Sequence, residues 1–198
     1  MNEKDTIEYL NSIDPNHKKN ILLHSCCGPC TSGVYPQLEK YFNISVLYYD
    51  PNIYPEEEYY KRLDALELLN KHFPFKIIEI GYNREDFLKQ VKGHEMDKEG
   101  GDRCEICFRL RMRETAIYAK KHGFDCFTST LSISPHKNAQ LLNEIGNELE
   151  KELGITYLYS NFKKKDGYKI SIENSKKFGL YRQTYCGCEF SKCDRESN

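Results

Sequence analysis

Ile21-Leu22-Leu23-His24-Ser25-Cys26-Cys27-Gly28-Pro29-Cys30 joins an apolar run to three cysteines that lie within five residues of one another. A short apolar run bounded by a turn predicts a buried strand of a parallel sheet, here over about 20–25. Gly28-Pro29 makes the chain turn directly after this strand. Ligands of open α/β sheets bind at the carboxyl ends of the strands, so we expect a site at these cysteines.

Outward from this stretch, short apolar segments alternate with amphipathic ones. We expect further strands at 44–49, 75–80, within 124–131 and at 155–159, and helices at 5–13, 34–42, 56–71, 84–91, 103–123, 137–152 and 171–179. Such alternation predicts a parallel sheet with helices on both faces. We therefore predict an α/β fold in one doubly wound domain over residues 1–198, with its core at about 20–180 and a cysteine-rich tail at 181–198.

The length and composition of the chain indicate a soluble globular protein. A chain of 198 residues suffices for one well-buried core and is slightly short for two. Charged residues make up 30%, and no apolar run approaches the roughly 18 residues of a membrane span. The N-terminus lacks the basic start and apolar stretch of a signal peptide, which predicts a cytoplasmic location.

The chain contains nine cysteines, an odd number, and most of them are closely spaced. Without an export signal, such a set predicts metal or redox chemistry instead of a disulfide scaffold. Three groups stand out: Cys26, Cys27 and Cys30; Cys104 and Cys107; and Cys186 and Cys188. We expect Cys126 to pack in a strand and assign no role to Cys193.

Cys104 and Cys107 lie at the start of a predicted helix, where the i, i+3 spacing puts both sulfurs on one face. The helix N-terminus, with Arg103 and Arg109, is expected to favour thiolates, the form that metal binding and redox chemistry need.

Cys26 and Cys27 are adjacent, and adjacent side chains of a strand point to opposite faces. Their sulfurs can converge only if the chain leaves the strand between them, which Gly28-Pro29 allows. Cys27-Gly28-Pro29-Cys30 is the competitor, because two cysteines separated by two residues could form a redox pair. The spacing alone does not choose between Cys26 and Cys30 as the fourth ligand. Joined to the pair in the later helix, two of these sulfurs make a four-thiolate site for zinc or a [4Fe–4S] cluster. Because the chain has its own predicted core, structural zinc is less needed, which favours the cluster.

Cys186-Gly187-Cys188 is a different kind of pair. A disulfide between residues i and i+2 closes a small, strained ring that is easily reduced, and glycine tolerates the backbone geometry that this requires. The pair could therefore cycle between dithiol and disulfide as a two-electron relay. The alternative is that both sulfurs bind a second metal ion.

Weaker signals accompany the cysteines. His24, Asp50, Asn52 and the run Ser134-Pro135-His136-Lys137 could face one crevice, although each is more often a cap or turn residue. The stretches 103–122 and 161–182 are locally basic in a chain with a formal net charge of −1. A solvated surface is the ordinary explanation for such a stretch, and phosphate binding is the other.

With these residues considered together, the chain resembles the QueH family of epoxyqueuosine reductases. The matching blocks are His24-Ser25-Cys26-Cys27-Gly28-Pro29-Cys30, Tyr49-Asp50-Pro51-Asn52-Ile53, Gly100-Gly101-Asp102-Arg103-Cys104-Glu105-Ile106-Cys107-Phe108, Thr128-Ser129-Thr130-Leu131, Ser134-Pro135-His136-Lys137 and Tyr181-Arg182-Gln183-Thr184-Tyr185-Cys186-Gly187-Cys188. The resemblance implies a HUP-like fold, related to the adenine-nucleotide α-hydrolases. It also implies an oxidoreductase that reduces the epoxide of epoxyqueuosine in tRNA to queuosine, the last step of queuosine biosynthesis.

The resemblance further implies that Cys26, Cys27, Cys104 and Cys107 hold a [4Fe–4S] cluster. By the same resemblance, Cys186 and Cys188 form a redox-active disulfide and are the catalytic pair. A second iron ion beside the cluster, a tRNA carrying epoxyqueuosine and an unidentified electron donor are implied as well. Our hypothesis is that the stretches 103–122 and 161–182 hold the tRNA backbone. Asp50 departs from the family pattern, where relatives often carry asparagine.

Two other functions compete with this one. Enzymes of this fold that use ATP begin with a phosphate-binding loop after the first strand, but here the loop keeps one glycine, and Pro29 lacks the N–H that phosphate would use. A zinc-binding interaction protein without catalysis is the other alternative.

Overall fold

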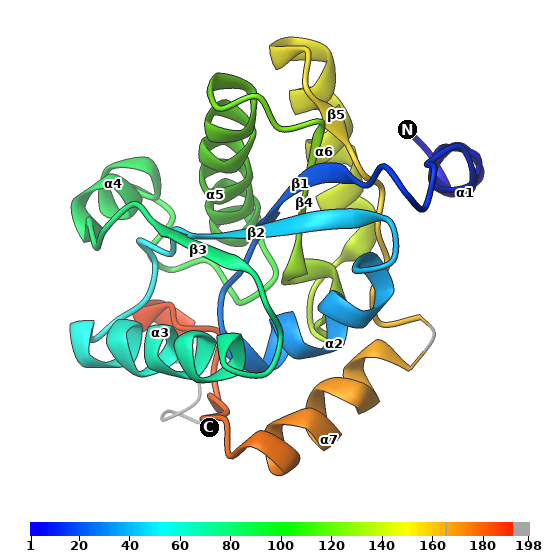
Figure 1. The fold of residues 1–198 in the computed structure, drawn as a ribbon. Coiled ribbons are helices and arrows are strands. Elements are labelled where there is room, and N and C mark those ends of the chain that lie inside the picture. Colours follow the sequence, from blue (N-terminus) through cyan, green and yellow to red (C-terminus); the bar gives the residue numbers. More distant parts are fainter. Residues whose placement is uncertain (165, 192–198) are drawn as a thin grey trace.

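The computed structural model describes residues 1–164 and 166–191, in which strands and helices alternate as predicted (Figure 1). The elements are α1 (Glu3–Asn11), β1 (Lys19–His24), α2 (Gly28–Leu38), β2 (Phe42–Tyr48), α3 (Glu56–Asn70), β3 (Lys76–Glu79), α4 (Arg84–Gln90), α5 (Asp102–Lys121), β4 (Cys126–Ser129), the 3-10 helix η1 (Thr130–Ile133), α6 (Ala139–Leu153), β5 (Thr156–Tyr157) and α7 (Gly167–Phe178). Cys193, in the last part of the predicted tail, lies outside the described residues.

All five strands form one parallel sheet in the order β3-β2-β1-β4-β5. This confirms the predicted α/β class. The chain builds the sheet outward from β1 through β2 to β3, and then crosses to the other side of β1 for β4 and β5. The order therefore reverses between β1 and β4, and the carboxyl ends of these strands border the crevice where such sheets bind ligands. The cysteine turn follows β1 at this point.

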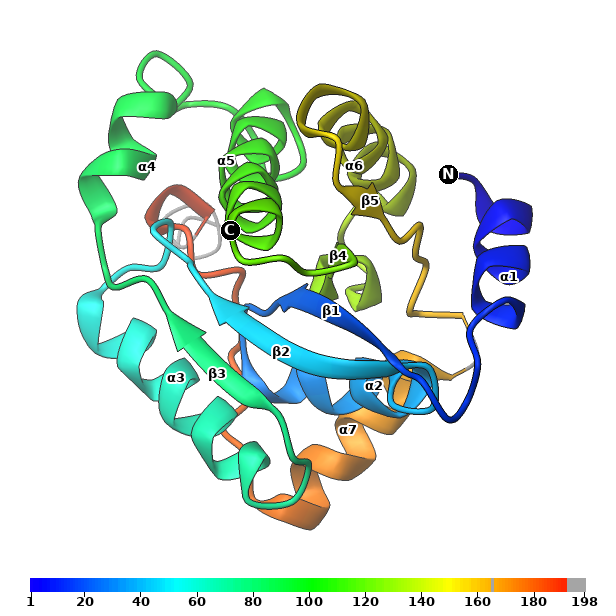
Figure 2. The ribbon, with the colours of Figure 1, turned by 45° about the horizontal axis from the view of Figure 1, so that its top comes forward.

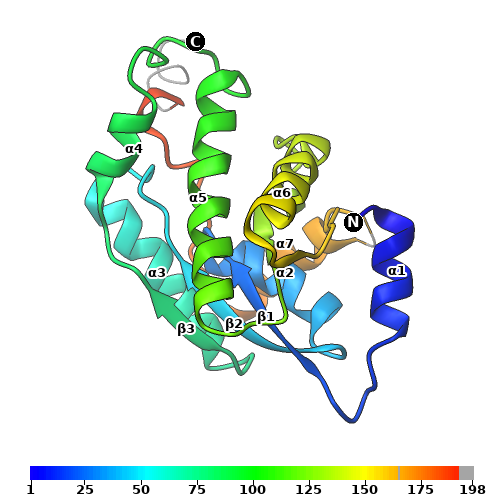
Figure 3. The same cartoon turned by 90° about the horizontal axis from the view of Figure 1, so that it is seen from above.

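Helices cover both faces of the sheet, with α2, α3 and α7 on one side and α5 and α6 on the other (Figure 2). Successive side chains of β1 pack alternately against the two helical layers, because strand side chains alternate between the faces of the sheet. Leu23 packs in the first layer with Val34 of α2, and Leu22 packs in the second with Met112 of α5. Figure 3 places α1 and α4 at opposite sides of the molecule. Within the described residues, every helix is too short or too polar to cross a bilayer.

Three helices begin two or more residues earlier than the sequence predicts: α1, α2 and α7, the last of which begins at Gly167 instead of 171. Asn2 caps α1: the Asn2 side chain accepts a hydrogen bond from the Asp5 N–H, and the Asp5 carboxylate accepts one from the Asn2 N–H. The helix predicted from residue 34 begins at Gly28, because the sulfur of Cys27 caps it by accepting the N–H of Cys30. The cysteine turn and α2 are therefore one structural unit.

Gly28 is required by the packing of α2 against α3. A Cβ atom at this position would lie 2.2 Å from the backbone oxygen of Ala65. Gly28→Ala is expected to lower the free energy of unfolding by about 1–3 kcal/mol, because backbone cannot move aside as a side chain can. Gly101→Ala is the control. The nearest atom to its Cβ would be the oxygen of Lys98 at 3.2 Å, and a shift of a few tenths of an ångström relieves that contact. Urea titration of the two variants should separate them, and equal midpoints would contradict this account.

Candidate metal and redox site

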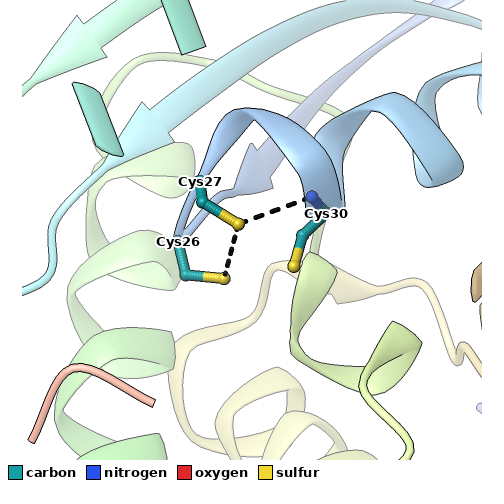
Figure 4. Close-up of side chains that lie close together, drawn as sticks. All are labelled: Cys26, Cys27 and Cys30. Carbon is teal, nitrogen blue, oxygen red and sulfur yellow. Dashed lines mark hydrogen bonds between the residues drawn. The ribbon is translucent and has the colours of Figure 1, made fainter. Parts of the chain in front are cut away.

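Three cysteines converge beyond the carboxyl end of β1 (Figure 4). The strand ends at His24, so Cys26 and Cys27 are free of its alternation, as convergence requires. The sulfurs of Cys26 and Cys27 lie 3.8 Å apart, and with Cys30 all three lie within 4.8 Å of one another. The prediction that the adjacent sulfurs converge is confirmed. Cys30 joins them, so geometry does not remove it as a competing ligand.

The three thiols differ in acidity. Hydrogen bonds from Cys27 and Cys30 hold the pKa of Cys26 well below its usual value, and the charges of Lys137 and Arg111 act in the same direction. Burial raises the pKa of Cys27 to about 12, and the hydrogen bond to Cys26 raises that of Cys30 well above its usual value. Of the three thiols, Cys26 is therefore the one whose pKa is shifted toward the thiolate, the form that binds a metal.

Cys104 and Cys107, in the first two turns of α5, line a cavity of about 110 Å³ together with Cys186 and Cys188. Phe87, Phe108 and Leu141 add apolar side chains to its wall. The predicted helical pair and the predicted tail pair thus meet in one small chamber.

A larger cavity of about 200 Å³ adjoins this chamber and is lined by Cys26, Cys30 and Cys186. Among the described cysteines, Cys186 alone lines both cavities. The cavities also share Arg111, His136 and Lys137. The structure therefore brings all three predicted cysteine groups to one end of the sheet.

The four predicted ligands do not form a site for a single ion. Tetrahedral zinc holds sulfurs about 2.3 Å from its centre, which places them about 4 Å from one another. Within residues 1–164 and 166–191, Cys26 and Cys27 do not form such a group with Cys104 and Cys107. A ligand shared by both pairs must be larger than an ion, which suits a cluster. The assignment of these four residues stays a prediction.

The expectation of thiolates at the start of α5 is wrong for this structure. Burial raises the pKa of Cys107 to about 12 and also raises that of Cys104. Arg109 does not stabilise thiolates at Cys104 and Cys107, because its guanidinium forms ion pairs with Glu105 and with Glu148 of α6.

Unpartnered buried donors surround the four-cysteine chamber. Nε and Nη2 of Arg103 and Nε of Arg111 are buried without a hydrogen-bond partner among the described residues, and both side chains line the chamber. An unsatisfied buried donor costs about 1–3 kcal/mol, and more if it is charged. Cationic N–H groups in a chamber lined by Cys104 and Cys107 suit an anionic group with sulfur acceptors, as thiolate-bound iron and sulfide would be. These two predicted ligands and their arginine neighbours therefore fit a [4Fe–4S] cluster, and Cys26 lines the adjoining cavity.

A buried charged network lies beneath the cavities. Asp50 forms an ion pair with Arg111, and both side chains are buried. His24 lies beside them, with its Nε2 3.7 Å from Oδ1 of Asp50 and its Nδ1 2.9 Å from the hydroxyl of Ser129. His24 and Asp50 therefore support the crevice from below and do not face it.

Of the weaker sequence signals, Asn52, His136 and Lys137 do line the crevice. Sequence reasoning missed Arg62 and Gln183. Gln183 donates a hydrogen bond of 3.0 Å to the sulfur of Cys27. Arg62 falls on the buried side of α3 with Tyr59 and Leu66. That helical spacing was the signal that could have identified Arg62.

The arginines of the basic stretch 103–122 contact other parts of the protein. Arg113 forms an ion pair with Glu152 of α6, as Arg109 does with Glu148. Lys120 donates to the backbone oxygen of Leu153. These side chains of α5 bind α6, so the structure does not support the hypothesis that they hold the tRNA backbone.

The comparisons with known proteins agree with this site. The family model described as "Epoxyqueuosine reductase QueH" matches residues 21–194. A protein of that name from Streptococcus pyogenes is 38% identical over 180 residues, covering 88% of this chain and 71% of its own. Its namesake from Staphylococcus aureus is 41% identical over 182 residues (88% and 76%), and that from Thermotoga maritima is 35% identical over 180 residues (88% and 91%).

A solved structure shares the fold. It is the U34-tRNA thiolase NcsA from Methanococcus maripaludis with its [4Fe–4S] cluster, with a TM-score of 0.51 and 12% sequence identity. The match covers 98% of this chain and 73% of that chain. At this identity the likeness concerns the fold alone, and it confirms the predicted HUP-like architecture.

Proposed function

The chain belongs to the epoxyqueuosine reductase QueH family, and from this premise we propose that it reduces the epoxide of epoxyqueuosine in tRNA to the alkene of queuosine. It is an oxidoreductase of tRNA modification and performs the last step of queuosine biosynthesis. The observation that carries this conclusion is the chamber lined by four cysteines and by unpartnered arginine donors, at the switch point of the sheet. We place the reaction in the cytoplasm, where thiols stay reduced.

Cys26, Cys27, Cys104 and Cys107 would hold a [4Fe–4S] cluster between the cysteine turn and α5. When bound, the cluster supplies electrons one at a time. Arg111 lies near both pairs, because it lines the larger cavity with Cys26 and its Nη1 lies 3.9 Å from the sulfur of Cys107. A second iron ion stays a prediction, which iron analysis tests.

Cys186 and Cys188 would store both electrons of one turnover as a dithiol. Every described cysteine is a free thiol in this structure, so their disulfide stays a prediction. In the overall reaction both C–O bonds of the epoxide break and a C=C bond forms. The two thiols lose two protons and two electrons as their S–S bond forms, and the oxygen leaves as water with those protons. An external donor then returns two electrons, with two protons, to the disulfide.

The larger cavity is the proposed place of the substrate nucleotide. Lys137 and Arg182 line it and can bind phosphate, while Tyr168 and Tyr185 provide aromatic surface. Bases of single-stranded RNA loops are commonly splayed out and stacked on such rings. A base in this cavity reaches Cys186, which also lines the four-cysteine chamber.

Spectroscopy with a substrate assay tests this function. Anaerobically purified protein should be brown, absorb broadly near ~400 nm and contain about four iron atoms and about four sulfides per chain, or about five irons if the second ion is present. With a chemical reductant it should convert epoxyqueuosine in tRNA to queuosine, as measured by mass spectrometry of the digested nucleosides. Colourless protein with stoichiometric zinc, or iron-loaded protein without conversion, would overturn the proposal.

Cys188→Ser should separate the relay from the cluster. Iron content and absorbance should be retained, because the predicted ligands are unchanged, while turnover falls by about 100-fold or more. Cys126→Ser is the matched control, since Cys126 is buried in the core and lines neither cavity. A Cys188→Ser protein with undiminished turnover would refute the relay.

A further inference from the structure

The side chain of Arg62 is only 1% exposed, and its guanidinium reaches from α3 to the tail. Nη1 donates to the backbone oxygen of Cys186 at 3.1 Å, and Nη2 donates to that of Tyr185 at 3.2 Å. Nε donates to the carboxylate of Glu58 at 2.8 Å, one helical turn earlier. One buried cation therefore binds two consecutive carbonyls at the entry to the Cys186-Gly187-Cys188 turn.

The rest of the turn fits closely around this arginine. The N–H of Tyr54 donates to the backbone oxygen of Gly187 at 2.8 Å. Gly187 has φ +104°, and a Cβ atom there would lie 2.9 Å from Ile53 and 3.0 Å from Nη1 of Arg62. The other oxygen of Glu58 accepts the hydroxyl of Tyr181 at 2.7 Å, so Glu58 links the start of the tail to the same cation.

Within the turn, the sulfur of Cys186 lies over the backbone of Cys188. The N–H of Cys188 donates to the sulfur of Cys186 at 3.4 Å, which brings that sulfur back over the third residue of the turn. An i, i+2 disulfide needs this curvature. Gln183 also ties the preceding segment to the sulfur of Cys27.

We propose that Arg62 is the positioning residue of the redox turn: its guanidinium holds Cys186-Gly187-Cys188 in the curvature that lets the two thiols close their own disulfide. This inference rests on the relay role proposed above. In the step that it favours, the two S–H bonds break, the S–S bond forms, and two electrons and two protons pass to the epoxide. The planar guanidinium of arginine suits this role because its N–H groups can bind two carbonyls at a fixed separation. The ammonium of lysine is a compact charge and cannot hold both carbonyls in the same way. Glu58 balances the charge, which offsets the cost of burying it.

The test measures disulfide formation directly, in full-length, iron-loaded protein. Arg62→Lys and the unaltered protein are equilibrated with glutathione redox buffers, and the disulfide between Cys186 and Cys188 is quantified by alkylation and peptide mass spectrometry. Its equilibrium constant should fall about tenfold or more in Arg62→Lys, because a looser turn lowers the effective concentration of one thiol near the other. Iron content and absorbance should not change.

Arg84→Lys is the matched control. Arg84 forms an ion pair with the side chain of Glu189, just beyond the turn, and no carbonyl of the turn is bound by it in the described contacts. The equilibrium constant of Arg84→Lys should stay within about twofold of the unaltered value, since lysine can keep an ion pair with Glu189 and this pair does not bind the backbone of the turn. If Arg62→Lys does not fold, Glu58→Gln keeps an acceptor for Arg62, removes the charge, and should give an intermediate decrease.

Three outcomes separate the proposals. Equal constants for Arg62→Lys and Arg84→Lys, or an unchanged constant in Glu58→Gln where it is the variant used, would overturn the role of Arg62 and leave the relay intact. An unaltered protein that forms no disulfide between Cys186 and Cys188 under any buffer would overturn both. A decrease of about tenfold or more in Arg62→Lys, or a smaller one in Glu58→Gln where it is the variant used, with Arg84→Lys within about twofold, supports the inference, whatever the turnover on tRNA.

Discussion

Cys107→Ser is expected to yield protein without its cluster and with epoxide reduction no higher than background. The reason is chemical: iron–sulfur clusters are held by thiolates, and serine offers a hydroxyl of much higher pKa. Cys107 is buried in the four-cysteine chamber, beside Arg111, whose Nη1 lies 3.9 Å from its sulfur. Iron and sulfide content, absorbance near ~400 nm and turnover should all fall together.

The same measurements decide between Cys26 and Cys30. Cys26→Ser should lose the cluster, because Cys26 is a proposed ligand and the surroundings lower its pKa, and Cys30→Ser should retain it, because its pKa is raised. Cys126→Ser should also retain it, since that cysteine belongs to the core. Retention of iron in Cys107→Ser, with loss in Cys186→Ser, would show instead that the tail supplies ligands.

Asp50→Ala is expected to lower the free energy of unfolding by about 3–5 kcal/mol, the largest stability change that we predict. Removing one partner of a buried ion pair leaves the other charge without compensation. Here the stranded charge is Arg111, which is 3% exposed, and His24 loses a polar neighbour as well. Urea unfolding of the metal-free full chain gives this energy, because loss of a bound cofactor would break two-state behaviour.

Two variants calibrate that result. Glu152→Ala breaks the pair with Arg113, in which both side chains are about half exposed, and should cost less than about 1 kcal/mol. Asp50→Asn keeps the shape and one acceptor for Arg111, so its cost should fall between the two. A change below about 1 kcal/mol in Asp50→Ala would contradict the structural role of the pair.

The local pattern of the sequence was enough to predict the sheet and the place of the site. The apolar run before Cys26 identified a buried strand, and the general behaviour of open sheets placed the ligands at its carboxyl end. The start of α2 could not be predicted, because a thiol cap such as that of Cys27 is not among the usual N-cap side chains. For α1, both Asn2 and Asp5 are good caps, and only the structure shows that they act together.

The electrostatics of the site could not be read from the sequence. Arginine is seldom fully buried unless it is paired, so a run rich in arginine predicts a surface. Arg111 is buried because Asp50, far away in the sequence, compensates it. Arg62 and Glu58 have the i, i+4 spacing of a surface pair, yet both lie beneath the tail. The thiolate prediction for Cys107 failed for a related reason, since burial outweighs the helix terminus.

The segment 181–188 is synthesised after all five strands, yet it supplies part of the wall of both cavities. Gln183 joins this segment to the sulfur of Cys27, and Arg62 binds the backbone oxygens of Tyr185 and Cys186. The walls of both cavities therefore depend on a segment that follows the whole sheet in the chain. A chain truncated after residue 180 should keep all five strands and leave both cavities open on the side of the tail.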